Sequence, residues 1–233
     1  ESSTEPGSLV SLPQYVARMR EGQKSIYYAM GVSPSMLANS PHLEVLKKRG
    51  YEVLFMTDGI DQWALEGLTE FDGKPLANAM DAELELSNES DRAASTPEQT
   101  NEAGEIQPLL DRFSKVLEGK VSEVRVSKRL TDSPVCLVIP KGGLPSHIER
   151  ALRSMKHELP ESKRILEVNP DHELIQSLKA KLERDPTAPK LTEWIELLHA
   201  QALLSEGSPL EDPARFAARL TGLLQRAAAS ELA

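Results

Sequence analysis

The chain has 233 residues, a formal net charge of −9 and 39% hydrophobic residues, with only 4% aromatic residues. This length accommodates two domains, and the apolar content is sufficient for a buried core made mainly of aliphatic side chains. The negative charge argues against general binding to nucleic acid or to an anionic membrane. No apolar run approaches the ~20 residues that span a bilayer.

Two features bear on where the protein resides and where it begins. Cys136 is the only cysteine, so no internal disulfide can form, which is typical of a reducing compartment such as the cytoplasm. The first eight residues, ESSTEPGS, have neither an initiator methionine nor the pattern of a signal peptide. We therefore expect a piece of a longer cytoplasmic protein that starts with a frayed linker.

The first part of the chain alternates predicted helices and strands. The run YEVLFM is almost continuously apolar, which is typical of a strand buried on both faces of a parallel sheet. The rhythm of strand, helix, strand and helix predicts a small α/β/α subdomain over residues 1–85. The strands are predicted at 26–30 and 51–56. The first helix is predicted at 11–21, the second begins at Ser40-Pro41, and the third begins at Asp58 or Asp61. The third helix carries Ile60, Trp63, Ala64 and Leu68.

The composition changes over residues 81–105, which are acidic, polar and nearly free of large apolar side chains after Leu86. Such a composition indicates a linker or a partly helical segment. We place the domain boundary here, with an acidic linker at 86–100 and a second, mixed α/β domain at 101–233. This domain is predicted to hold helix 106–117 with Pro108 in its first turn or at a kink, strands at 121–126, 135–139 and 164–168, an amphipathic helix at 144–155, and a helix capped by Asn169-Pro170.

The C-terminal residues 191–229 are predicted to form a helical hairpin. One helix runs from its N-cap Thr192 to Ser205, and apolar residues cover more than half of its circumference. After a turn at Gly207, Asp212 caps a second helix with a narrow apolar seam. Pairing with a second copy in a four-helix bundle would bury both surfaces, although the hairpin could instead cover its own sheet. The residues expected at the dimer interface are Trp194, Ile195, Leu198, Phe216, Leu220, Leu223 and Leu224.

The sequence contains no recognisable catalytic or metal site. Segment 67–74, GLTEFDGK, has five residues between its glycines and a proline where a phosphate loop needs a hydroxyl. The histidines lack metal-ligand spacing, and His172 and His199 are interpreted as solvated helix residues. Cys136 lies in an apolar strand, where a thiol is inert, and Asp58 and Asp61 are interpreted as helix caps.

The predicted helix 144–155 has two possible roles. Its apolar stripe includes Leu144, Ile148 and Leu152, and such a stripe most often packs into a core. The preceding Gly142-Gly143 pair indicates mobility instead, and a mobile amphipathic helix can bind apolar polypeptide segments. Both interpretations stay open at this point.

Five stretches together resemble a known family. They are LPQYVARMREGQKSIYY at 12–28, SPHLEVLKKRGYEVLFMTDGIDQWALEGLTEFDGK at 40–74, RLTDSPVCLV at 129–138, LEVNPDH at 166–172 and the terminal hairpin. In this order they resemble the heat shock protein 90 family, most closely its bacterial form. The resemblance implies that 1–85 ends the middle domain and that 101–233 is the dimerisation domain of an ATP-driven chaperone. The ATP and magnesium site would lie upstream, so this chain would be no enzyme and would hold no cofactor.

The resemblance also implies partners. The chain would form a homodimer and bind non-native client proteins. It ends in AAASELA, whereas eukaryotic cytosolic members end in a MEEVD motif that docks co-chaperones, so that docking is expected to be missing. No nucleic acid or membrane partner is expected. The residues that match the client contacts of the family are Gln62, Trp63, Glu66, Leu144, Ile148 and Leu152.

Two other functions remain in consideration. One is an acidic α/β enzyme with an unrecognised site, which a pocket of carboxylates or histidines with perturbed pKa values would favour. The other is a purely structural dimerisation module without a client surface. An exposed apolar patch would favour the chaperone over both.

Overall fold

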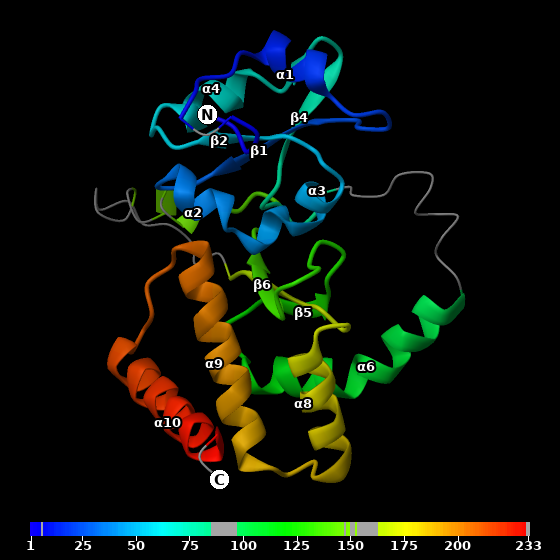
Figure 1. Cartoon of the computed structure of the whole chain (residues 1–233), viewed down its shortest axis with the longest axis vertical. Coiled ribbons are helices and arrows are strands. Elements are labelled where there is room, and N and C mark those ends of the chain that lie inside the picture. The colour runs from blue at the N-terminus through cyan, green and yellow to red at the C-terminus, as the bar shows by residue number, and fades with distance from the viewer. Residues whose placement is uncertain (6, 85–96, 147, 150–151, 153–162, 232–233) are drawn as a thin grey trace.

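The protein, seen in a computed structural model, is described over residues 1–5, 7–84, 97–146, 148–149, 152 and 163–231. Its strands form two separate sheets, one of four strands and one of three. Figure 1 shows the first sheet with its helices in the upper half of the molecule and the second sheet with its helices in the lower half. The predicted mixed α/β architecture with two sheet-based units is therefore confirmed.

The first sheet has the order β2-β1-β4-β3. The central strand β1 runs parallel to both β2 and β4, and β3 pairs with β4 in an antiparallel hairpin. Asp72 and Gly73 both have positive φ in the hairpin turn, a conformation in which the favoured two-residue connections join two strands. This hairpin was not predicted, because two residues are too few to give an alternating pattern in β3. The strands are β1 (Ile26–Met30), β2 (Val53–Met56), β3 (Glu70–Phe71) and β4 (Lys74–Asn78).

Both faces of this sheet are covered, as the continuous apolar strands predicted. On β1, Tyr27 and Ala29 belong to the cluster under α2 and α3, while Ile26 packs with Tyr15 of α1 on the opposite face. Figure 1 shows α1 and α4 above the sheet, and α2 and α3 between the sheet and the second unit. The helices are α1 (Leu12–Arg18), α2 (Pro34–Ala38), the 3-10 helix η1 (Pro41–Leu43), α3 (Glu44–Lys48) and α4 (Asp61–Gly67).

Three local predictions in this unit are wrong. The first residues are not a frayed linker, because Ser2 is fully buried and forms a bridge with Leu54 beside β2. Helix α1 ends at Arg18, since Met19 already has an extended ψ of 139°. Asp58 does not cap α4, because Ile60 is the N-cap and no side chain bonds there.

The second sheet has the order β5-β7-β6, with β7 parallel to β5 and antiparallel to β6. Helices α6, α8 and α9 pack on one face around a large cluster that includes Phe113, Leu166 and Ile195. Helix α10 lies alongside α9, as Figure 1 shows. The elements are α6 (Pro97–Val116), β5 (Glu123–Val126), β6 (Val135–Val138), β7 (Ile165–Val168), α8 (Glu173–Arg184), α9 (Pro189–Glu206) and α10 (Pro213–Glu231).

Helix starts were the least accurate predictions here. Helix α6 begins at Pro97, so it overlaps the predicted linker, and Pro108 lies inside the helix instead of in its first turn. Helix α8 is capped by His172, whose Nδ1 accepts a hydrogen bond from the Leu174 backbone N–H, and not by Asn169. Helix α9 begins at Pro189, and the hydroxyl of Thr192 instead accepts a bond from Arg112.

The two units are joined by charged side chains that bond to backbone groups. The Glu44 carboxylate on α3 accepts hydrogen bonds from the backbone N–H groups of Thr131, Asp132 and Ser133 at 2.7, 2.9 and 3.2 Å. In the other direction, Arg129 donates to the carbonyl of Ala79 at 2.7 Å. These bonds fix the loop after β5 against the first unit.

We predict that Glu44→Ala lowers the free energy of unfolding by about 2–3 kcal/mol, because three N–H groups lose a charged acceptor. Glu44→Gln retains one carbonyl acceptor and should cost about half as much. Urea denaturation at pH 7 measures both changes, with the exposed Glu118→Ala as the control. Equal stability of Glu44→Ala and the control would contradict a structural role for the carboxylate.

His42 lies at the same junction and is buried in its neutral form. It is 2% exposed, and its Nδ1 has no hydrogen-bond partner among the described residues. Burial, followed by the charges of Arg129 and Arg164, lowers the pKa of His42 from 6.5 to about 3. A protonated imidazole therefore fits the unfolded chain better than the folded one.

We predict that acid weakens the fold through this histidine. Below pH 6.5 the unfolded chain takes up a proton that the folded chain does not accept until about pH 3, so stability is lost as the pH falls. His42 should account for about 2 kcal/mol of the stability lost between pH 8 and pH 5. Denaturation at both pH values should show this loss in the wild type and a smaller loss in His42→Gln. An identical loss in both proteins would contradict the burial of a neutral His42.

Candidate functional site: apolar surfaces on three helices

Helix α4 carries the most exposed of the predicted client residues. Trp63 is 70% exposed, and Ile60, one helical turn earlier, is 72% exposed. The turn-wise spacing places both side chains on the same side of the helix. Glu66 is also exposed, and the side chain of Gln62 lies outside the described part of the chain. Two large apolar side chains therefore form one solvent-exposed patch. Such a patch is more typical of a surface that binds another molecule than of residues packed in a core.

Ile60 was missed as a site residue. It was assigned to the helix as one of several apolar positions, and a wide apolar side normally indicates core. The signal that could have identified it is its spacing of three from Trp63, combined with the short length of α4.

The second predicted client surface is partly exposed. Ser146, Ile148, Glu149 and Leu152 are helical, and Leu144, Ile148 and Leu152 are each half-buried. These three predicted residues are therefore neither fully buried nor fully exposed, and Leu144 precedes the helical residues. The first turn of the amphipathic helix is held by backbone bonds from the Ile148 and Glu149 N–H groups to the carbonyl of Pro145, both at 3.0 Å.

The structure does not gather the two client surfaces into one patch. Figure 1 shows α4 on the side of the first sheet that faces away from the second unit. The helix that contains Ile148 instead begins beside the end of α9, where Ser146 donates a hydrogen bond to the Glu206 carbonyl. A client that touches both surfaces would have to be an extended chain and not a compact ligand.

The terminal hairpin uses its two helices differently. On α9, Ile195 and Leu198 are buried in the large cluster of their own chain, so part of the wide apolar arc covers the second sheet. Trp194 is half-buried beside this cluster. On α10, Leu220 and Leu224 are 43% and 61% exposed. The alternative in which the hairpin covers its own sheet therefore holds for α9, whereas α10 keeps an apolar surface toward water.

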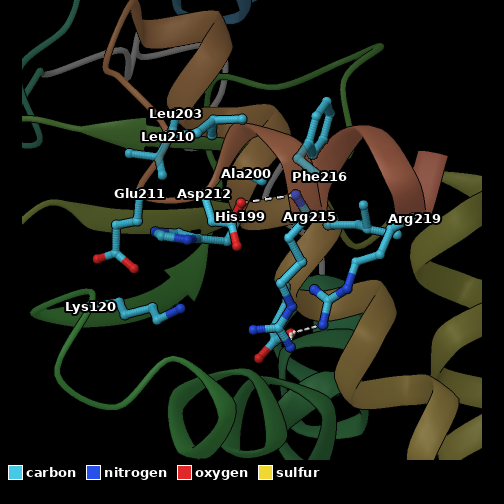
Figure 2. A pocket seen from close by; sticks show the side chains of 12 residues that line it. Lys120, His199, Ala200, Leu203, Leu210, Glu211, Asp212, Arg215, Phe216 and Arg219 are labelled. Carbon is cyan, nitrogen blue, oxygen red and sulfur yellow. Dashed lines mark hydrogen bonds and ion pairs between the residues drawn. The ribbon is translucent and has the colours of Figure 1, made fainter.

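Helix α10 contacts α9 through ion pairs as well as through partly buried apolar side chains. The side chains of Arg215 and Arg219 on α10, labelled in Figure 2, form ion pairs with the carboxylate of Glu196 on α9. The N–O distances are 3.7 and 2.6 Å. Within the apolar seam of α10, Phe216 and Leu223 are half-buried, whereas Leu220 and Leu224 are exposed. Asp212 accepts a bond from the Arg215 backbone N–H at 2.9 Å, which confirms the predicted cap. Partly exposed ion pairs contribute little, so an additional partner for the apolar seam would stabilise this helix.

The hollow between α9 and α10 does not have the chemistry of an active site. Its volume is about 100 Å³, smaller than the pockets that hold drug-sized ligands, and Lys120 and His199 lie at its edge in Figure 2. The prediction that His199 is solvated is wrong, because this residue is only 8% exposed. Burial lowers the pKa of His199 to about 4. His199 is therefore a buried imidazole that favours its neutral form.

Two further observations concern other kinds of chemistry. Burial raises the pKa of the Cys136 thiol, so the thiolate needed for nucleophilic attack is disfavoured, as the sequence predicted. Within the described ranges, no group of three or more His, Cys, Asp or Glu side chains is arranged to hold a metal ion. The same part of the chain has no helix long and apolar enough to cross a membrane.

Comparison with known proteins gives a consistent result. Residues 1–232 match a family model described as Hsp90 protein. The chaperone protein HtpG of Myxococcus xanthus is 54% identical over 231 residues, which cover 98% of this chain and 35% of that relative. HtpG of Geobacter sulfurreducens is 45% identical over 215 residues, 92% of this chain and 33% of the relative. The chain thus spans about a third of the length of these curated relatives.

The resemblance first recognised in five stretches extends over nearly all of the sequence. HtpG of Magnetococcus marinus, for example, is 43% identical over 219 residues, again 92% of this chain. These three relatives carry the same name, which agrees with the bacterial form of the family. The chain belongs to the Hsp90 protein family.

Proposed function

We propose that this chain supplies the dimerisation surface and part of the client-binding surface of an Hsp90-type chaperone. The observation that carries the proposal is the pair of apolar surfaces left toward water, Leu220 and Leu224 on α10 and Ile60 and Trp63 on α4. Exposed apolar patches of this kind are costly for a monomer in water and mark sites of association.

The dimer surface is assigned to α10 together with the outer side of α9. The seam of α10 repeats every three or four residues, and two of its members face water. A second copy packed about a two-fold axis would bury the seam twice and give a four-helix bundle. In this arrangement Ile195 and Leu198 contribute indirectly, because they pack α9 against the sheet of their own chain. The dimer contact would also include Trp194, Phe216 and Leu223.

The client surface is assigned to two separate places. Trp63 with Ile60 offers a large apolar contact on α4, and Leu144, Ile148 and Leu152 offer a second, half-buried contact near the end of α9. A non-native protein presents extended apolar segments that can reach both, and weak contacts joined by one chain reinforce each other. Gln62 and Glu66 would border the first contact.

The proposal places the remaining activities elsewhere. ATP and magnesium binding belong, on this proposal, to the part of the HtpG relatives that this chain does not span, and a cytoplasmic setting is proposed with it. The alternative of an enzyme has less support. The hollow between α9 and α10 measures about 100 Å³, and in the larger hollow of about 450 Å³ between α6 and α8 the Glu105 carboxylate is already paired with Lys179. The alternative of a purely structural module would leave the exposure of Ile60 and Trp63 without a role.

We predict that Leu220→Asp converts a dimer into a monomer. A charge placed in a desolvated seam costs at least ~3 kcal/mol, and two-fold symmetry applies this cost twice. The resulting ~6 kcal/mol weakens the dimer by roughly four orders of magnitude. Sedimentation at low micromolar concentration measures the change. Ala218→Asp adds the same charge on the opposite face of α10 and should leave the dimer intact, whereas a dimeric Leu220→Asp protein would disprove this interface.

We predict that Trp63→Ala weakens binding to a permanently non-native probe, reduced and carboxymethylated α-lactalbumin, by about tenfold. The melting temperature should hardly change, because the side chain is 70% exposed. Leu9→Ala is the matched control, since Leu9 is also a large, exposed apolar residue of the first unit, at 89% exposure. An equal loss of affinity in both variants would indicate nonspecific hydrophobic binding and would contradict a binding site on α4.

A further inference from the structure

Arg164, just before β7, connects segments that are distant in the sequence. Its side chain is 8% exposed and meets two carboxylates, that of Glu206 at 2.6 Å from Nε and that of Glu149 at 3.1 Å from a terminal nitrogen. The other terminal nitrogen donates to the carbonyl of Leu144 at 2.9 Å. One buried guanidinium thus bonds both Leu144, just before the first turn of the amphipathic helix, and Glu149, at the end of that turn.

Glu206 is the last residue of α9, and the hairpin turn begins directly after it. Gly207 follows with φ 85°, and the Ser208 hydroxyl donates to the same Glu206 carboxylate at 2.9 Å. The Glu206 carbonyl accepts a further bond from the Ser146 hydroxyl at 3.3 Å. The start of the amphipathic helix and the turn that leads to α10 therefore share one residue.

We propose that Arg164 and Glu206 are positioning residues that make the client surface at Leu144, Ile148 and Leu152 dependent on dimerisation. This inference rests on the proposed function, because it assigns a regulation to that client surface. Docking of α10 on a second copy orders the turn at Gly207, and Arg164 transmits this order to the amphipathic helix.

The physical basis is the cost of separating buried charges. Removing one partner from a buried ion pair leaves an uncompensated charge in a medium that solvates it poorly. The side chain of Glu206 is 1% exposed, so water cannot replace Arg164 without a rearrangement of the end of α9. When the hairpin moves, the amphipathic helix must follow it or lose these bonds. A shared network of this kind couples two surfaces if both depend on its arrangement.

Amide hydrogen exchange at Ile148 and Glu149 tests the coupling. Both amides close the first turn by bonding to Pro145, so their exchange reports opening of this helix. The wild-type chain should exchange at least about threefold more slowly when it is fully dimeric than in the Leu220→Asp monomer. Glu206→Gln keeps the size of the side chain but removes its charge. In this variant, the ratio of exchange rates between the Leu220→Asp monomer and the dimer should fall to about one.

Matched variants separate coupling from general loss of stability. Glu196→Gln removes another α9 carboxylate that binds an arginine, Arg219, but it has no bond to the amphipathic helix, so the exchange ratio should remain. If Glu206→Gln does not fold, Glu149→Gln breaks the network at its less buried carboxylate, which is 17% exposed, and should also abolish the ratio.

The outcomes distinguish this inference from the proposed function. A chain that dimerises, binds reduced and carboxymethylated α-lactalbumin and still shows equal exchange in dimer and monomer overturns the coupling alone. A ratio that persists in Glu206→Gln and in Glu149→Gln does the same. A chain that stays monomeric in sedimentation overturns the proposed function together with the coupling. Loss of the ratio only in the two network variants, with wild-type dimerisation, supports the positioning role.

Discussion

One buried carboxylate of the second sheet holds the arginines that reach the first unit, in addition to the bonds that Glu44 makes from the opposite side. Glu167 lies in the middle of β7, is 3% exposed and points away from the large cluster of its own unit. It accepts bonds from Arg129 at 2.9 Å and from Arg125 at 2.7 Å. Arg129 then bonds the carbonyls of Ala79 and Asp81, both at 2.7 Å, which belong to the chain that leaves the first unit. The face of the second sheet opposite the large cluster is thus covered through charged side chains, backbone groups and a small apolar cluster, which Ala82 joins.

Buried arginines recur in this structure where segments remote in sequence meet. Arg129 joins the two sheets, and Arg164 joins the amphipathic helix to the end of α9. Each guanidinium bonds carboxylates and backbone carbonyls at the same time, which its planar set of donors permits. Such contacts stabilise less than an apolar core of the same volume, but they tolerate only one geometry. They suit a protein whose surfaces must keep a defined relation to each other.

The apolar side chains have a complementary distribution. The cores under the two sheets account for most of them, and α9 contributes Leu191, Ile195 and Leu198 to the larger core. Among the exposed large apolar side chains, two pairs share a helix face, Ile60 with Trp63 at α4 and Leu220 with Leu224 on α10, whereas the others are Leu9, Val32, Met36, Leu174 and Leu204. A helix that packs on the molecule by one side can expose apolar groups without loosening the core. On the proposed function, association with a second copy and with non-native chains would therefore add to the fold without competing with it.

The sequence by itself determined the order of most elements, the two units, the family and the inert cysteine. Strands such as β1 and β6 were predictable because continuous apolar runs bounded by turn residues have few alternatives. The cap of α10 and the turn at Gly207 were predictable because they depend on neighbouring residues only.

Tertiary structure alone decided which apolar residues remain exposed and where charges are buried. Ile195 and Leu220 have similar patterns in the sequence, yet one is fully buried and the other 43% exposed, because only α9 lies on the sheet. His199 was expected to be solvated but is 8% exposed. Glu206 lies beside the turn glycine, and no sequence pattern indicated that its side chain is buried. Burial depends on what packs against a residue, and a local pattern contains no information about a remote neighbour.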